Sequence, residues 1–214
     1  MERIKTLSLW SGILGFVVVA LGAWTRLADA GLGCPDWPGC YGFVTIPVSP
    51  EEIDIANAKF PDTPYEVAKA IPEVVHRYFA AALGFMILCI AFLAFRYKDL
   101  PSDVRKLSFF LIAWVIMQGT FGYWTVSLKL WPQVVTTHLM SGFLTTGLLW
   151  LLYFKTKDRI QNRTTWNFGA TTKKLFNVSI LLVAIQIFLG AWTSTNYASY
   201  SCVAVSYTHL RAHE

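Results

Sequence analysis

Charged side chains are scarce in this sequence. Lysine, arginine, aspartate and glutamate make up 14% of the 214 residues, whereas a soluble domain carries about a quarter. The sequence contains no phosphate-binding glycine loop, dinucleotide fingerprint or nucleophile elbow, which excludes the common nucleotide-binding and hydrolase classes. Its basic residues are divided among short loops and form no single patch, so we expect no nucleic-acid partner. What the chain has instead of charge is long apolar runs.

Five apolar runs are long enough to cross a lipid bilayer, which takes roughly 20 residues per helix. The first is too long for the core of a signal peptide and no small-residue cleavage site follows it, so we interpret it as a retained span. The fold class predicted is therefore all-α, a polytopic membrane protein. The five runs are Leu7–Thr25, His76–Tyr97, Leu107–Ser127, Val134–Phe154 and Leu175–Tyr197.

The distribution of charge predicts the orientation. Basic residues cluster at the N-terminus and in residues 96–106 and 155–174, whereas the loop 26–75 carries eight acidic residues against three basic ones. By the positive-inside rule the N-terminus is cytoplasmic and the acidic loop lies outside. The sequence thus favours a multi-pass protein of a cell inner membrane.

An internal repeat divides the chain further. The first, third and fifth runs each end in Gly-x-Trp-Thr, at residues 22–25, 122–125 and 190–193. Tryptophan prefers the membrane interface and glycine lets helices approach closely. An interfacial belt accounts for the tryptophans but not for the shared Gly and Thr. The pattern predicts duplicated helical hairpins within a larger duplication.

The repeat predicts the domain organisation. Residues 1–157 form an N-terminal four-helix transmembrane bundle with the long outer loop 26–75. Residues 158–174 are a cytoplasmic linker, and residues 175–202 are the first helix of a second, truncated bundle. Residues 203–214 do not continue the pattern and resemble translated read-through, so we interpret them as a non-native tail and exclude His209 and His213 from the chemistry.

Two histidines then remain, His76 and His138, at matching places in the second and fourth runs and on the same, outer side. Ionisable side chains in membrane segments are costly and usually mark a site. A single such histidine is commonly a hydrogen-bonded packing residue. A facing pair can instead bind a haem iron, and zinc lacks third and fourth ligands here. Small residues one turn on, Ala80 and Gly142, would leave a gap for a flat macrocycle.

The first histidine has charged neighbours. Glu73 and His76 are three residues apart, so on a helix they share a face. The Glu73 carboxylate could orient the imidazole, accept a proton or face a substrate, and Arg77 could meet a propionate. Pro72 suits the first turn of the helix. The alternative is that Glu73, His76 and Arg77 form an interfacial ion cluster.

Cysteine usage adds one candidate pair. Cys34 and Cys40 lie close together in the outer loop, where a disulfide is the default outside the cytoplasm. The pair is either a structural staple or a redox-active pair or transient thiol ligand. Cys89 lies within a span and is interpreted as a packing residue, and Cys202 lacks a partner.

Several of these segments, in this order, resemble the haem A synthase family of cytochrome oxidase assembly. The resemblance covers roughly residues 7–202. The segments that carry it are Gly22–Leu27, Gly31–Gly42, Glu73–Arg77, Thr137–His138 and Thr193–Tyr197.

The resemblance implies an eight-span oxidoreductase of two four-helix halves that oxidises a methyl group of haem O to formyl, giving haem A. It implies that His76 and His138 hold the iron of the substrate haem, that Glu73 is the family's catalytic acidic residue, and that Cys34 and Cys40 are its outer-loop cysteine pair. Haem b is expected mainly in the second half, so this chain alone is expected to be inactive. Expected partners are haem O, the lipid membrane, haem O synthase, cytochrome oxidase assembly proteins and a second copy in a homo-oligomer.

Other functions remain open from the residues. A cytochrome b-like electron carrier would use the same histidines but gives no role to Glu73. A membrane thiol oxidoreductase passing electrons from Cys34 and Cys40 to a quinone would need the cysteines and not the histidines. A structural assembly factor would bind no chromophore.

Overall fold

The computed structural model describes residues 1–97, 99–161 and 168–198, and in these ranges the chain is helical, with an isolated bridge between Cys40 and Phe43. Five helices are long and apolar enough to cross a membrane, and α2 is too short. The prediction of an all-α polytopic membrane protein is confirmed. The helices are α1 (Glu2–Leu27), α2 (Pro50–Lys59), α3 (Val67–Arg96), α4 (Ser102–Ser127), α5 (Pro132–Gln161) and α6 (Ala170–Thr195).

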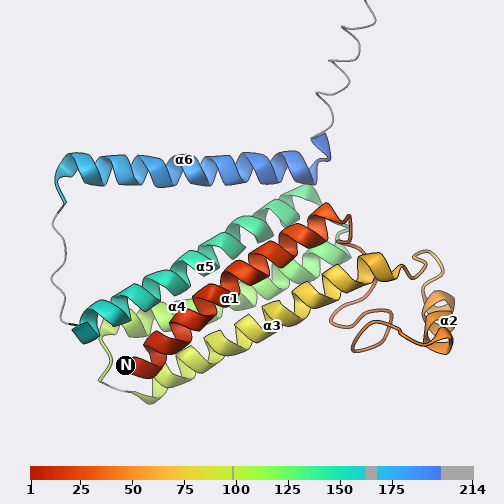
Figure 1. Ribbon diagram of the computed structural model, residues 1–214, viewed down its shortest axis with the longest axis horizontal. Coiled ribbons are helices and arrows are strands. Elements are labelled where there is room, and N and C mark those ends of the chain that lie inside the picture. Colours follow the sequence, from red (N-terminus) through yellow and green to blue (C-terminus); the bar gives the residue numbers. More distant parts are fainter. Residues whose placement is uncertain (98, 162–167, 199–214) are drawn as a thin grey trace, which may run out of the picture.

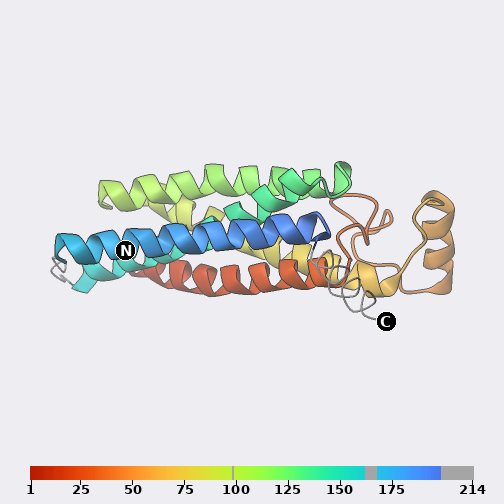
Figure 2. The ribbon, with the colours of Figure 1, turned by 90° about the horizontal axis from the view of Figure 1, so that it is seen from above.

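Four helices, α1, α3, α4 and α5, run side by side as an elongated bundle (Figures 1 and 2). Helices α1 and α4 each pack against both α3 and α5. In the described part of the chain the diagonal pairs, α1 with α4 and α3 with α5, make no contact. We call the end of the bundle where α1 and α4 finish and α3 and α5 begin the loop end, because the long segment 28–66 lies there.

Helix α3 begins earlier than the sequence indicates. It starts at Val67, so Pro72 lies inside the helix and the prediction that it occupies the first turn is wrong. Proline has no N–H to donate within the helix. The missing donor deprives the carbonyl four residues earlier of its helical partner. The Thr25 hydroxyl donates to a different group, the Pro72 carbonyl, at 3.1 Å and so joins α1 to α3. This Thr belongs to the Gly-x-Trp-Thr repeat.

Helix α2 lies within the stretch that the sequence analysis treats as loop. Ser49 caps it, and a capping box joins Ser49 to Glu52 with Pro50 at the first position. The Glu52 carboxylate accepts the Val48 and Ser49 N–H groups at 2.8 and 3.1 Å. These two hydrogen bonds hold the pKa of Glu52 below its ordinary value. The Ser-x-x-Glu spacing is the local signal that predicts this helix start.

The apolar core occupies the end of the bundle away from the loop. Among the fully buried members are Ile87 and Ile90 of α3, Leu111 of α4 and Leu149 of α5. On α3 the cluster ends at Leu83, seven residues or about two turns short of His76. The bundle is therefore filled by aliphatic side chains far from the loop end and by a different set of residues near it.

Helix α6 stands apart from the bundle. Its backbone approaches that of α5 and diverges from it away from the loop end (Figure 1), and Arg26 of α1 donates to the Ser194 carbonyl. Its buried residues are Ala191 and Thr195, and the Thr195 hydroxyl is 3.2 Å from that of Thr136 on α5. Helix α5 continues to Gln161, beyond the predicted bundle boundary at residue 157. Part of the predicted linker, Cys202 and the predicted tail 203–214 lie outside the described residues.

Candidate functional site

Two histidines approach the bundle axis from opposite corners. His76 is on α3 and His138 on α5, the diagonal pair of helices that do not contact one another. Both side chains are partly exposed, yet the Nδ1 atom of each is buried and has no hydrogen-bond partner among the described residues. The two imidazoles lie within electrostatic range of each other. Each ring also has a backbone hydrogen bond, His76 with Val18 and His138 with Gln118. Buried polar atoms are rarely left unpaired, so the open position on each ring is its Nδ1 atom.

A glycine lies against each of these rings. A Cβ built on Gly22 of α1 would stand 3.1 Å from His76 Cε1, and one built on Gly122 of α4 would stand 3.6 Å from His138 Cε1. Both glycines lie five residues before the end of their helix, at the same depth below the loop end. The histidines therefore lie at matching depths as well. These are the glycines of the Gly-x-Trp-Thr repeat.

The residues present fit a tetrapyrrole between α3 and α5. Imidazoles from two opposed helices are the ligand set of a bis-histidine haem. Each ring carries an unpartnered nitrogen, and the aliphatic core does not extend to this depth on α3. No group of three or more His, Cys, Asp or Glu side chains with metal-site geometry occurs in the described residues.

Hydrogen bonds between α4 and α5 surround His138. Gln118 Nε2 donates to the His138 carbonyl at 3.0 Å, and the Ser141 hydroxyl donates to Gln118 Oε1. Trp114 Nε1 donates to the Ser141 carbonyl at 3.3 Å. A Cβ on Gly142 would meet Gln118 Nε2 at 3.2 Å. The prediction that Gly142 leaves space for a macrocycle is therefore wrong, since the Gln118 amide fills that space.

Glu73 lies on the same helix as His76 and is almost enclosed, with 4% of its surface exposed. Its Oε1 forms an ion pair with Arg77, and its Oε2 accepts the Cys34 N–H at 2.9 Å. The carboxylate is thus held by one charged and one backbone donor. Such fixing orients a carboxylate that acts on a neighbouring group.

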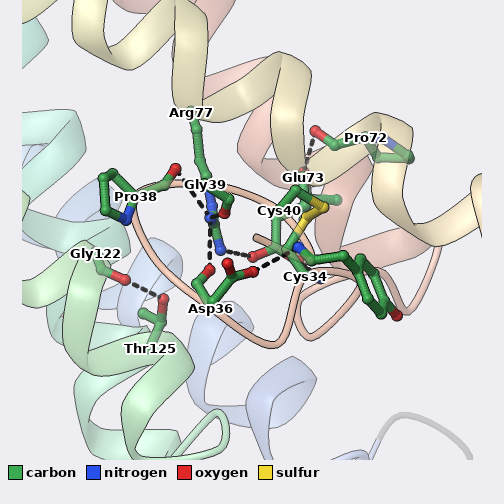
Figure 3. Close-up of polar contacts among 12 residues, drawn as sticks. Cys34, Asp36, Pro38, Gly39, Cys40, Pro72, Glu73, Arg77, Gly122 and Thr125 are labelled. Atoms are coloured by element: carbon green, nitrogen blue, oxygen red, sulfur yellow. Dashed lines mark hydrogen bonds and ion pairs between the residues drawn. A yellow bond between two sulfur atoms is a disulfide. The ribbon is translucent and has the colours of Figure 1, made fainter. Parts of the chain in front are cut away.

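Arg77 reaches from α3 into the loop above it (Figure 3). Its Nη1 donates to the backbone carbonyls of Asp36 and Gly39 at 2.9 and 2.6 Å, while its Nη2 pairs with Glu73. Both terminal nitrogens are therefore already engaged. A role for Arg77 toward a propionate stays a prediction.

The loop itself is closed by a disulfide between Cys34 and Cys40, whose side chains are fully buried. Asp36 accepts the Tyr41 and Gly42 N–H groups at 2.6 and 2.7 Å, which fixes the turn between the cysteines. The predicted disulfide between the two cysteines is therefore present in the structure. Its chemical role stays open.

The same loop extends over the neighbouring hairpin. Trp37 packs edge-on against Tyr123 of α4 with ring centroids 5.8 Å apart, and a Cβ on Gly31 would collide with Leu130 at 2.9 Å. The loop therefore spans the loop end from α3 to α4. A shallow apolar hollow farther out, between Pro47 and Tyr65, contains no histidine or cysteine and so offers no iron ligand.

Comparison with known proteins assigns the family. The profile of the COX15-CtaA family, described as cytochrome oxidase assembly protein, matches residues 5–210. The chain belongs to this family. A "Heme A synthase" of Shewanella oneidensis is 43% identical over 196 residues, covering 90% of this chain and 57% of the relative. A "Heme A synthase" of a Wolbachia of Brugia malayi is 26% identical over 216 residues, covering 90% of this chain and 63% of that relative.

A more distant member is the "Heme A synthase COX15" of Saccharomyces cerevisiae, 27% identical over 181 residues, which are 70% of this chain and 37% of the relative. The chain thus spans less than two thirds of the length of these curated relatives. No solved structure matches it.

Sequence reasoning missed one feature of this COX15-CtaA family member. The repeat was visible, but its glycines were assigned to close helix approach, whereas the structure places two of them against the site histidines. The signal that connects them is depth, because Gly22 and His76 both lie near the loop end of adjacent, antiparallel helices.

Proposed function

We propose that the chain is the N-terminal half of a haem A synthase, an oxidoreductase that converts a methyl group of haem O to a formyl group to give haem A. Haem O is the substrate and binds between α3 and α5, with His76 and His138 as iron ligands. The observation that supports this most directly is the pair of imidazoles at matching depth on opposed helices, each with an unpartnered buried nitrogen.

Different residues of the chain would bind the substrate and accept its protons. His76 and His138 hold the substrate and exclude other ligands from its iron. Conversion of methyl to formyl removes protons and electrons and adds an oxygen atom, so a proton acceptor is needed beside the macrocycle. We assign this role to Glu73, which shares a helix face with His76 and is fixed by Arg77 and the Cys34 N–H. Haem b, expected mainly in a second half, would supply redox chemistry for electron removal.

The loop between α1 and α3 would enclose the substrate's edge. Arg77 fixes the loop's backbone, and Trp37 attaches it to α4. Closing a site in this way keeps water from reactive groups. The Cys34–Cys40 disulfide would then act chiefly as a staple that keeps the loop in place.

The proposal includes a location. The basic residues gather at the end of the bundle opposite the loop end, which supports a cytoplasmic N-terminus and a loop end on the outer side of an inner membrane. Helix α6 begins a second bundle, because it leaves the first one and repeats Gly-x-Trp-Thr. Haem O synthase, assembly proteins and a second copy of the chain are the partners to be tested.

Haem titration of the purified chain in detergent tests the proposal. Haem O should give the spectrum of a six-coordinate low-spin iron with two imidazole ligands. His76→Ala and His138→Ala should each abolish that spectrum, while His213→Ala, the same substitution in the tail, should preserve it. Unchanged haem O binding in both site variants would contradict the assignment.

A bis-histidine electron carrier is the second candidate, because it also accounts for the two opposed imidazoles. Mass analysis of the haem extracted from cell membranes separates the two functions. A synthase carries haem O or haem A, whereas a carrier retains haem b alone.

A further inference from the structure

Two glycines of the long helices face the histidines, whereas Gly12, Gly15 and Gly142 face Trp150, Thr146 and Gln118 and four others face open space. A Cβ on Gly84, Gly119, Gly147 or Gly190 would have no atom within 4 Å. At Gly22 the three nearest atoms are Cε1, Nδ1 and Nε2 of the His76 ring, at 3.1, 3.6 and 3.7 Å. At Gly122 the one atom within 4 Å is Cε1 of His138. The nearest neighbour of each glycine is therefore an imidazole ring.

Helix formation does not explain glycine at these two places. Glycine in a helix interior is less stable than alanine, because its backbone loses more freedom on folding. The neighbours of Gly22 and Gly122 are side-chain ring atoms and not the backbone of a crossing helix. The nearest atoms therefore do not indicate close approach of two helix backbones. At Gly22 the ring leaves too little space for a methyl group, and at Gly122 a methyl group would be in ordinary contact with the ring.

The two diagonal pairs of helices carry different residues of the site. Helices α3 and α5 carry the histidines, and helices α1 and α4 carry the glycines. Each imidazole thus packs against a helix that carries no candidate iron ligand. A ring held on one side by a flat backbone surface has its position and rotation limited, and rotation decides where a ligand nitrogen points.

We propose that Gly22 and Gly122 are positioning residues that set the orientation of the His76 and His138 imidazoles for binding an iron tetrapyrrole. The inference rests on the proposed function, since it assigns these residues to the same site. Neither glycine touches the iron. Each acts through the histidine that it faces, and the third glycine of the repeat, Gly190, has no ring against it in this chain.

The two contacts predict graded effects. The 3.1 Å distance at Gly22 is shorter than an ordinary contact, so a methyl group there displaces the His76 ring by a few tenths of an ångström. The 3.6 Å distance at Gly122 is ordinary van der Waals contact, so a methyl group there restricts the His138 ring without displacing it. Gly22→Ala should therefore alter the site more than Gly122→Ala.

The test uses the whole chain in detergent with iron protoporphyrin IX as the probe. Two properties are measured for each variant, the binding affinity and the electron paramagnetic resonance spectrum of the ferric complex, whose largest g value depends on the relative orientation of the two imidazole planes. Gly22→Ala should lower the affinity about tenfold and shift that g value, as changes beside a metal ligand commonly do. Gly122→Ala should shift the g value less and lower the affinity less.

Two alanine variants serve as matched controls. Gly119→Ala is on the same helix as Gly122, and Gly190→Ala is at the same place in the repeat, yet neither side chain would meet another atom. Both should match the unsubstituted chain. Thermal unfolding of the haem-free chains adds a second readout, because alanine by itself favours the helix, whereas a general packing defect lowers the stability of the haem-free chain. Loss of affinity without loss of haem-free stability is the expected signature of positioning.

The outcomes separate the inference from the proposed function. If Gly22→Ala and Gly122→Ala keep the affinity and the g value while His76→Ala and His138→Ala abolish binding, the positioning role is overturned and the haem site stands. Equal losses in Gly119→Ala and Gly22→Ala would also overturn it. If the unsubstituted chain binds no haem, both fall. Should Gly22→Ala fail to fold, Gly122→Ala decides the question, because its added methyl group meets no close contact.

Discussion

The hairpins α1–α3 and α4–α5 share one arrangement and differ in everything built around it. Each places a glycine of its first helix against a histidine of its second. The connection in the first hairpin is the long segment 28–66 with a disulfide and a helix of its own, whereas residues 128–131 suffice in the second. The shared glycine–histidine contact provides two equivalent candidate ligands. The long segment of the first hairpin contacts charged side chains that lie beside one of them, His76.

The surroundings of the two histidines differ accordingly. Beside His76 lie the enclosed carboxylate of Glu73 and the guanidinium of Arg77. Beside His138 lies a neutral network of the Gln118 amide and the Ser141 hydroxyl. The two repeated hairpins therefore differ mainly through the long loop of the first. We expect the reactive steps beside His76, where the charged side chains lie.

The largest effect should come from the Glu73–Arg77 pair, which is nearly enclosed, whereas the ion pairs of Asp103 in the second hairpin are partly exposed. Glu73→Ala leaves the guanidinium of Arg77 without its counter-ion in a nearly enclosed place, and we expect a loss of about 3 kcal/mol in unfolding free energy. Denaturant unfolding in detergent measures it. The matched control is Glu66→Ala, because Glu66 pairs with Lys69 at the surface, where a pair contributes about 0.5 kcal/mol. Equal losses in the two variants would remove the distinction between the hairpins.

Removal of the disulfide should rank second. Cys34→Ser with Cys40→Ser opens a short closed loop, and the chain-entropy account gives a loss of about 2 kcal/mol. Hydrogen exchange should accelerate at the Cys34 amide, which Glu73 binds, and stay unchanged around His138. Cys89→Ser replaces the free thiol of α3 and is the control. Faster exchange spread over both hairpins would show that the loop holds the whole bundle and not its own side.

The neutral network of the second hairpin should contribute less. Gln118→Ala removes hydrogen bonds to the His138 carbonyl and from the Ser141 hydroxyl, with an expected cost of about 1 kcal/mol. Thr137→Ala is the control, because the Thr137 hydroxyl bonds only to the Gln133 carbonyl of its own helix. A loss as large as that of Glu73→Ala would contradict the view that the two sides differ in charge chemistry.

The smallest effect concerns acid and the loop helix α2. The pKa of Glu52 is lowered in the folded chain, so its stabilisation of α2 is complete above the ordinary value of 4.5 and is lost as the pH falls through the lower folded value. Protection of the Val48 and Ser49 amides from exchange, relative to the intrinsic rate at each pH, should fall over that range, and Glu52→Gln should weaken this change. Protection that stays constant with pH in the unsubstituted chain would exclude the carboxylate cap.

Much of this architecture is encoded in local sequence. Hydropathy predicts the five spans. The spacing of Ser49 and Glu52 encodes the start of α2, although hydropathy alone indicates a loop there. The start of α3 differs from the expectation because Pro72 lies inside the helix. The hydrogen bond from Thr25 to the Pro72 carbonyl joins residues 47 positions apart, and such a long-range contact leaves no local trace.

The candidate site likewise combines features that the local sequence encodes with features that depend on helix packing. The pairing of His76 with His138 was predicted from their matching places, because the repeat fixes depth along the membrane. Which helices are neighbours and which are diagonal is a property of the bundle, and hydropathy carries no information about it. The contact of Gly22 with His76 and the binding of loop carbonyls by Arg77 depend on that packing and were not predicted.

The attachment of α6 has a mechanical consequence. The polar contacts that join it to the bundle involve Ser194, Thr195 and Tyr197, all at its loop end, through Arg26, Thr136 and Asp29. A rod fastened at one tip can swing at its other tip without breaking the fastening. The fulcrum here is close to the level of the two imidazoles. The far part of α6 is therefore free to change its angle to α5 while the distance between Thr195 and Thr136 stays nearly constant.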